Sequence, residues 1–196
     1  MRGNKIGRWF DKKNRNQVAF KTVVEEGDND DYKNNVRNQV TILKRLKGCD
    51  YILRFYGLTC DGEKWYLITE WAEFGNLREY YNNYDFNVEK KLKFAVDIAR
   101  GLNFLRSIEI IHRDIRAENI LITDHETAKI ANFKSSRTLA QETRKQSATL
   151  EAVRYLAPEM LGQRTVKYDT KCEVYSFGIL LWEIAEQKIP YEKHND

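Results

Sequence analysis

The 196-residue sequence predicts an α+β fold in two parts: a small antiparallel β part with one helix, followed by a larger and mainly helical part. Two observations lead to this prediction. Before Gly75, runs rich in β-branched and aromatic residues alternate with turn residues. After Gly75, long segments instead repeat apolar residues every three or four positions, which is the spacing of helices. The boundary between the parts is predicted near residues 71–75.

Strands and one helix account for the first part. Residues 17–24, QVAFKTVV, alternate and are rich in β-branched residues, which indicates a strand. Residues 51–71 form two β-rich runs around Asp61-Gly62, which predicts a hairpin. Residues 36–48 have apolar side chains at helical spacing and end at Gly48, so an amphipathic helix is expected there. The polar residues 25–35 before it are expected to form a mobile loop.

Two long helices frame the second part. The helix predicted over residues 87–108 has one apolar face, expected to be buried, consisting of Leu92, Ala95, Ala99, Leu102 and Leu105. Residues 173–186 are apolar on nearly every side, which predicts a helix buried in a larger core. Between them, IIHRDIRAENILI (110–122) has two short apolar runs around a polar loop, followed by a short strand at 127–131.

Composition excludes several classes of function. The net charge of +4 arises from 33 basic and 29 acidic residues that are interspersed, so a nucleic-acid surface is not expected. The three cysteines have no CxxC spacing, which argues against a zinc site or a disulfide framework and favours a reducing compartment. The N-terminus has no apolar signal region, and the longest apolar runs are too short to span a bilayer. We therefore predict a cytoplasmic protein that binds neither membrane nor nucleic acid.

Four motifs occur in the order and approximate spacing of protein kinases: VAFK (18–21), HRDIRAEN (112–119), APE (157–159) and EVYSFGILLWEI (173–184). The sequence thus resembles a protein kinase domain over nearly its whole length. RYLAPEM and SFGILLWEIAEQKIPY are similar to the tyrosine-kinase-like group, and the degenerate motifs resemble mixed-lineage kinase-like pseudokinases.

The resemblance implies a two-lobed protein-kinase-like fold. Residues 1–70 would form the N-terminal lobe, residues 71–75 the hinge, and residues 76–196 part of the C-terminal lobe. The family's first strand and glycine-rich phosphate loop have no counterpart, and the last helices of the large lobe are also missing. The domain is therefore expected to be incomplete at both ends.

The resemblance also places an ATP site between the lobes. Period-two alternation puts Ala19 and Lys21 on one strand face, so a small residue can lie against adenine while the ammonium reaches the phosphates. Thr69 would be a small gatekeeper, and the backbone of Glu70 and Ala72 would hydrogen-bond the base.

The loop HRDIRAEN would carry the chemistry in such a domain. Asp114 would be the catalytic base, and Asn119 would hold a metal through its side-chain oxygen. Arg113 would meet a phosphate on the following loop, and His112 is expected to be a packed core residue. Leu121 would cover the adenine, although a plain core residue would show the same pattern. Arg116-Ala117-Glu118 resembles tyrosine kinases whereas RYLAPE resembles serine/threonine kinases, so the class of substrate hydroxyl stays open.

Charged groups of the family are replaced in several places. Asn132-Phe133-Lys134 stands where the family has Asp-Phe-Gly, and a neutral amide is a weaker metal ligand than a carboxylate. Gln39 stands where the family has the glutamate that pairs with the strand lysine, so Lys21 is expected to make a neutral hydrogen bond to Gln39 instead. Leu43, one turn later, would contact Phe133. Glu173 replaces an aspartate in the buried helix.

These replacements favour a pseudokinase: a kinase-shaped binding and switching module that holds ATP with weak or absent Mg²⁺. The alternative is an active protein kinase that transfers the γ-phosphate to protein Ser/Thr or Tyr hydroxyls. A third possibility is a fragment that folds badly, because truncation exposes core surface. Expected partners are protein substrates or signalling proteins, and an upstream kinase.

Residues 132–159 are predicted to form an activation-type loop that the upstream kinase phosphorylates, rather than an ordinary polar surface loop. Candidate regulatory positions are Gln39, Arg113 and Phe133 together with the hydroxyls of Ser135, Ser136, Thr138, Thr143, Ser147 and Thr149.

Overall fold

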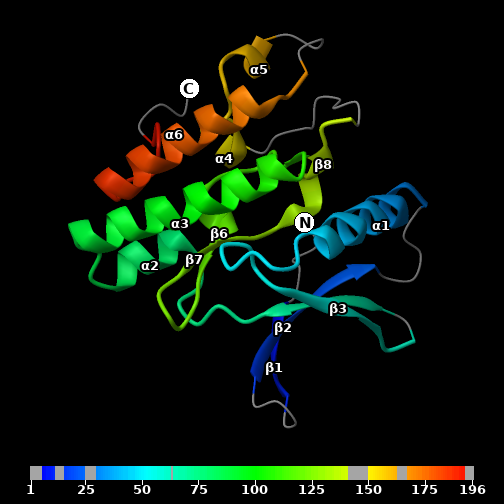
Figure 1. Cartoon of the computed structure of the whole chain (residues 1–196). Helices are drawn as coiled ribbons and strands as arrows, with labels where there is room; N and C mark the ends of the chain where they lie inside the picture. Colours follow the sequence, from blue (N-terminus) through cyan, green and yellow to red (C-terminus); the bar gives the residue numbers. More distant parts are fainter. Residues whose placement is uncertain are drawn as a thin grey trace.

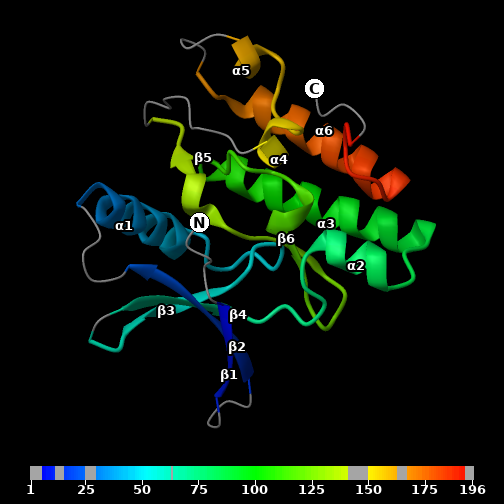
Figure 2. The same ribbon diagram turned by 180° about the vertical axis from the view of Figure 1, so that it is seen from behind.

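The small lobe is a four-stranded antiparallel sheet with one helix packed against it. The computed structural model describes residues 6–11, 16–24, 30–62, 64–140, 150–162 and 167–192. The strand order is β1-β2-β4-β3, and α1 contacts β2 (Figures 1 and 2). The elements are β1 (Ile6–Asp11), β2 (Asn16–Val24), α1 (Asp30–Arg45), β3 (Phe55–Cys60) and β4 (Trp65–Glu70).

The predicted hairpin is confirmed, and the predicted helix is longer than expected. β3 pairs with β4 across a turn in which the Lys64 N–H donates to Asp61 Oδ1 at 2.8 Å and Gly62 has a φ of +103°. Helix α1 already begins at Asp30, so the loop expected over residues 25–35 is wrong from residue 30 onward. Tyr32 packs against the core one turn before Val36, which extends the apolar face towards the N-terminus. Residues 25–29 lie outside the described residues.

The large lobe is mainly helical, with two small two-stranded sheets, β5-β8 and β6-β7. The short strand expected at 127–131 is confirmed as β7. The elements are α2 (Leu77–Asn83), α3 (Val88–Ser107), β5 (Ile110–Ile111), η1 (Ala117–Asn119), β6 (Ile120–Ile122), β7 (Ala128–Ile130), η2 (Phe133–Ser135), β8 (Arg137–Thr138), α4 (Leu150–Val153), α5 (Glu159–Gly162) and α6 (Thr170–Glu186). Figures 1 and 2 show α3 lying between α6 and the segment that carries β6 and β7. The predicted α+β fold with two lobes is confirmed.

The buried face of α3 differs from the predicted one. Leu92 is 64% exposed and Ala99 is also exposed, whereas the buried face is Phe94, Asp97, Ile98, Gly101 and Leu105. Gly101 lies on this buried face, where a Cβ would be 2.8 Å from Ile130 Cδ1 and 3.1 Å from the carbonyl oxygen of Tyr51. The glycine therefore allows α3 to pack closely against β7 at this position.

Helix α6 is covered on one side only by the part of the chain that the structure describes. Leu180 and Ile184 face the core, while Val174 is 68% exposed and Trp182 is 46% exposed. Among the residues that the structure describes, the predicted burial of this helix in a larger core is therefore met on one face only. A uniformly apolar helix pattern shows that burial is favourable, but it does not show which neighbours supply it.

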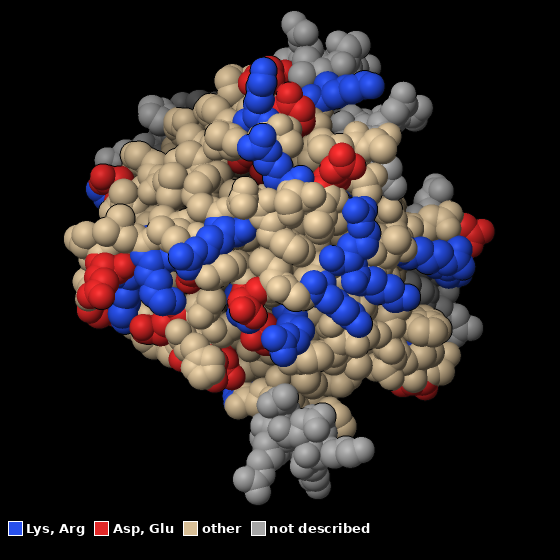
Figure 3. Space-filling view, viewed as in Figure 1, with Lys and Arg blue, Asp and Glu red and all other residues tan. Residues whose placement is uncertain are grey.

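Charges of both signs are scattered over the face shown in Figure 3. Several basic side chains gather over α1 and the end of α3. Lys44 and Arg45 occupy the last turn of α1, and Arg106 occupies the last turn of α3. Cations at these positions interact favourably with the negative ends of the helix dipoles. Arg45 also donates to the carbonyl of Ile108 at 2.8 Å, which ties the two helix ends together. None of the described helices is both long and apolar enough to cross a bilayer.

Candidate functional site

The loop 112–116 is held in place by a carboxylate from α6. Glu173 Oε1 accepts the backbone N–H groups of His112 at 2.7 Å and Arg113 at 3.1 Å. Glu173 is buried, and burial raises the pKa of its carboxyl to about 7 although the two N–H donors oppose the shift. Arg113 has a φ of +71°, so the loop contains a strained residue at this point. The glutamate therefore still fixes the loop backbone where the family has an aspartate.

His112 joins this loop to the segment that carries Asn132. Its Nε2 lies 2.8 Å from the carbonyl oxygen of Ala131. The His112 and Phe133 rings pack edge to face, with their centroids 4.8 Å apart. His112 is fully buried, and desolvation lowers its pKa. Phe133 belongs to the same buried cluster as Leu43 of α1. The core thus links α1, the loop and Asn132.

Four predicted site residues form one hydrogen-bonded chain. Lys21 Nζ donates to Asn132 Oδ1 at 3.3 Å, and Asn132 Nδ2 donates to Asn119 Oδ1 at 3.0 Å. Asn119 Nδ2 donates to the backbone carbonyl of Asp114 at 2.7 Å. Because Lys21 can only donate and a carbonyl can only accept, these two ends fix the orientation of both amides. Tertiary structure brings these side chains together from β2, η1 and the start of η2.

The hydrogen bond expected between Lys21 and Gln39 is absent from the described structure. Gln39 is buried and lines a small cavity of about 20 Å³ together with Lys21, Tyr32 and Lys134. The ammonium instead bonds the oxygen of Asn132, which follows β7 in the large lobe. Burial, and then the charge of Lys134, lower the pKa of Lys21. The Lys134 ammonium itself lies 5.9 Å from the centroid of the Tyr32 ring.

The two predicted metal ligands at this point, Asn119 and Asn132, are both neutral amides. Mg²⁺ is usually held by carboxylate oxygens and keeps near-octahedral geometry. The oxygens of Asn119 and Asn132 both accept hydrogen bonds within the chain of amides. No group of three or more His, Cys, Asp or Glu able to hold a metal occurs among the residues that the structure describes.

The predicted adenine contacts Ala19, Thr69 and Leu121 lie on β2, β4 and β6, respectively. Ala19 pairs with Thr69 in the sheet, and both are partly exposed. Ile120 and Ile122 are fully buried whereas Leu121 is partly exposed, so Leu121 lies on the face of β6 that is turned away from the core.

The connection after β4 is anchored to the large lobe. The Glu70 carboxylate pairs with the Lys129 ammonium at 2.8 and 2.9 Å, and the Glu70 N–H donates to the backbone carbonyl of Arg54. The Ala72 carbonyl accepts the N–H of Gly75, whose φ is +69°. The positive φ favours glycine at position 75, and a side chain there would also displace the Glu79 carboxylate.

The predicted regulatory hydroxyls fall into three groups. Ser135 and Ser136 are buried, and Ser136 Oγ donates to the carbonyl of His112, so neither is accessible as a phosphorylation site in this arrangement. Thr138 is partly exposed in β8, where it pairs with Ile110. Three further hydroxyls lie outside the described residues: Thr143, Ser147 and Thr149.

Comparison with known proteins agrees with this geometry. The family model described as "Protein tyrosine and serine/threonine kinase" matches residues 4–196. The chain belongs to the protein kinase family. It is 34% identical to a Drosophila melanogaster protein named "Putative mitogen-activated protein kinase kinase kinase 7-like" over 165 residues, and this alignment covers 81% of the chain. It is 35% identical over 159 residues, or 80% of the chain, to "Serine/threonine/tyrosine-protein kinase HT1" of Arabidopsis thaliana. The kinase domain spans 40% of the length of each of these relatives.

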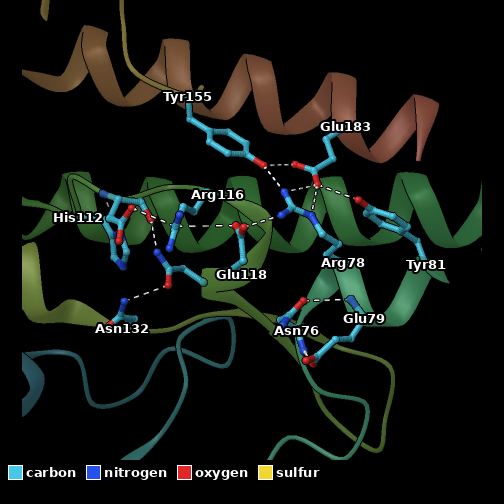
Figure 4. Close-up of polar contacts among 12 residues, drawn as sticks. Asn76, Arg78, Glu79, Tyr81, His112, Arg116, Glu118, Asn132, Tyr155 and Glu183 are labelled. Atoms are coloured by element: carbon cyan, nitrogen blue, oxygen red, sulfur yellow. Dashed lines mark hydrogen bonds and ion pairs between the residues drawn. The ribbon is translucent and has the colours of Figure 1, made fainter. Parts of the chain in front are cut away.

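One polar network of this kinase domain was not predicted from the sequence. Arg78 of α2 donates to Glu118 at 2.6 Å, to Glu183 at 3.0 and 2.9 Å, and to the hydroxyl of Tyr155 at 2.8 Å (Figure 4). The hydroxyl of Tyr81 also donates to Glu183 at 2.9 Å. Glu183 is fully buried, so Arg78 neutralises a carboxylate that would otherwise be costly to bury.

The same network reaches the predicted catalytic base of the kinase domain. Arg116 Nε lies 3.4 Å from Asp114 Oδ1 and 3.8 Å from Glu118 Oε2. A signal for the position of α2 was present in the sequence. Asn76 and Glu79 form a capping box, with Asn76 Oδ1 accepting the Glu79 N–H at 3.0 Å and the Glu79 carboxylate accepting the Asn76 N–H at 2.8 Å. The partners of Arg78 have no such local signal.

Proposed function

We propose that this kinase domain is a pseudokinase-type scaffold or switch, with an ATP-type pocket whose phosphotransfer is impaired. The observation that carries the proposal is the chain from Lys21 through Asn132 to Asn119. In active kinases a carboxylate at the position of Asn132 holds the metal that bridges the phosphates. Here an amide fills that position, and its two polar atoms bind neighbouring side chains. Loss of one preorganised electrostatic contact in a transition state costs about 10²–10³-fold in rate.

The residues at the predicted adenine contacts support the proposal that the chain still has a nucleotide pocket. Ala19, Thr69 and Leu121 have small or apolar side chains that are partly exposed at the lobe boundary. In this proposal, the Glu70 carbonyl and the Ala72 N–H hydrogen-bond the base, and Lys21 contacts the phosphates. We likewise propose residues 1–70 as the N-terminal lobe, 71–75 as the hinge and 76–196 as the C-terminal part.

An active protein kinase is the alternative, and the placement of Asp114 favours it. The loop is held by Glu173, Asn119 lies beside it, and Arg116 contacts the Asp114 carboxylate. The base, the lysine and one amide ligand thus remain available for transfer to protein hydroxyls.

Transfer of labelled γ-phosphate by the purified chain separates the two candidates. The chain, the Asn132→Asp variant and the Asp114→Asn variant are compared with Mg²⁺ and with Mn²⁺ on a general protein substrate. The proposal expects no transfer above the Asp114→Asn background for the unmodified chain. Transfer that depends on Asp114 in the unmodified chain would make the protein an active kinase.

Signalling partners follow from the same proposal. Arg113 lies 5.7 Å from the centroid of the Tyr168 ring, and burial followed by the charge of Arg137 lowers its pKa. A phosphate added by an upstream kinase at Thr138 or beyond would meet these two guanidiniums and order the loop. We place the protein in the cytoplasm, a compartment in which the thiols of its three cysteines, which are free, stay reduced.

A further inference from the structure

Two lysines lie close together beside Asn132, the residue that bonds Lys21. Lys21 and Lys134 both line the small cavity between β2 and α1, and the charge of Lys134 acts on Lys21. Within the described ranges, neither ammonium has a carboxylate as its ion-pair partner; Lys21 bonds an amide and Lys134 lies over the Tyr32 ring. The carboxylate of Asp114 is already 3.4 Å from Arg116. The charge balance at the lobe boundary is therefore positive.

A metal ion would have to share its ligand oxygens with hydrogen-bond donors. The oxygens of Asn119 and Asn132 each already accept one hydrogen bond, from Asn132 and Lys21, which leaves one lone pair on each neutral oxygen for the ion. A divalent cation on Asn132 Oδ1 would also lie close to the Lys21 ammonium, which is 3.3 Å from that oxygen. Like charges at such distances repel, and partial burial strengthens the repulsion.

A polyphosphate would meet the opposite situation. Its negative oxygens would accept hydrogen bonds from the ammonium groups of Lys21 and Lys134, and such charge-assisted bonds are stronger than neutral ones. Neither lysine has to leave a carboxylate to make them. The positive charges of the two lysines would therefore take the place of the metal ion that neutralises the phosphates in other members of the family.

We propose that the cleft binds nucleoside triphosphate as the free, metal-free anion, and that Lys134 is the residue that supplies the missing positive charge. This inference rests on the proposed nucleotide pocket, and it goes further by naming the ionic form of the ligand. Excess Mg²⁺ should weaken binding, because it withdraws free ATP into a complex with less negative charge.

Calorimetric titration with ATP, in EDTA and in excess Mg²⁺, tests the proposal. The expected result is tighter binding in EDTA than in excess Mg²⁺. Lys134→Ala should weaken ATP binding in EDTA by about tenfold, because one charge contact to the phosphates is lost. Lys44→Ala is the matched control: it removes the same charge from the exposed last turn of α1, outside the cavity, and should leave the affinity unchanged.

Two further ligands locate the effect. Adenosine should bind equally to the unmodified chain and to Lys134→Ala, whereas inorganic tripolyphosphate should bind the variant more weakly. Thermal unfolding without ligand checks that Lys134→Ala is folded. Binding that requires Mg²⁺, or an ATP affinity unaffected by Lys134→Ala in the folded variant, would overturn the inference. Either result leaves the proposed loss of phosphotransfer standing, because that proposal is tested by transfer and not by binding.

Discussion

Asn132→Asp should restore dependence on metal without restoring phosphotransfer. The side chains are nearly equal in size, so the change adds one negative charge 3.3 Å from Lys21 Nζ and removes the donor that bonds Asn119 Oδ1 at 3.0 Å. Attraction between unit charges at that distance is about 1 kcal/mol in water-like surroundings and about 5 kcal/mol at an effective dielectric constant of 20. The variant therefore neutralises Lys21 and releases an oxygen of Asn119, so that carboxylate and amide can both bind Mg²⁺.

The same variant should still fail to transfer phosphate. Gln39 cannot replace the charge that positions Lys21, and misplacement of a reacting group by about 1 Å can cost 10²-fold. We expect rescue only when Gln39→Glu and an N-terminal glycine-rich phosphate loop are added. The assays are calorimetry with and without Mg²⁺, and transfer of labelled γ-phosphate, with Asp114→Asn added to each variant as the background. Robust phosphorylation by Asn132→Asp alone, lost on Asp114→Asn, would refute this reasoning.

Three other predictions concern stability and regulation. Arg78→Ala leaves the fully buried Glu183 carboxylate without its cation, so urea unfolding should show a loss of about 3–5 kcal/mol; a loss below about 1 kcal/mol would contradict the burial argument. The pKa of Glu173 rises from 4.5 to about 7 on folding, so the folded chain binds that proton more tightly and its free energy of unfolding should fall as pH rises from 4.5 to 7. Glu173→Gln should flatten this fall, and unchanged pH dependence in that variant would assign it to other groups. Phosphopeptide mapping of protein from cells should find phosphate at Thr138 or within residues 141–149; sites entirely outside residues 132–159 would end the proposal of a switch.

Local sequence was enough to predict several strands and helices and the spacing of the predicted site residues along the chain. Alternation in residues 17–24 placed Ala19 and Lys21 on one face of a strand, and Asp61-Gly62 marked a hairpin that the structure contains. The spacing within residues 112–119 put Asp114 and Asn119 on one short loop. These features depend on neighbours within a few residues, which is why a single sequence is enough to predict them.

Tertiary structure alone decided which partners these residues have. Lys21 bonds Asn132, 111 positions away, rather than the expected Gln39, and Arg78 finds Glu183 across 105 positions. The face of α3 that is buried contains Gly101, which packs against Ile130 of β7. An apolar or charged pattern records what a side chain prefers to contact. The identity of that contact depends on chain segments that meet only after folding, since each hydrogen bond goes to the group that packing brings within reach.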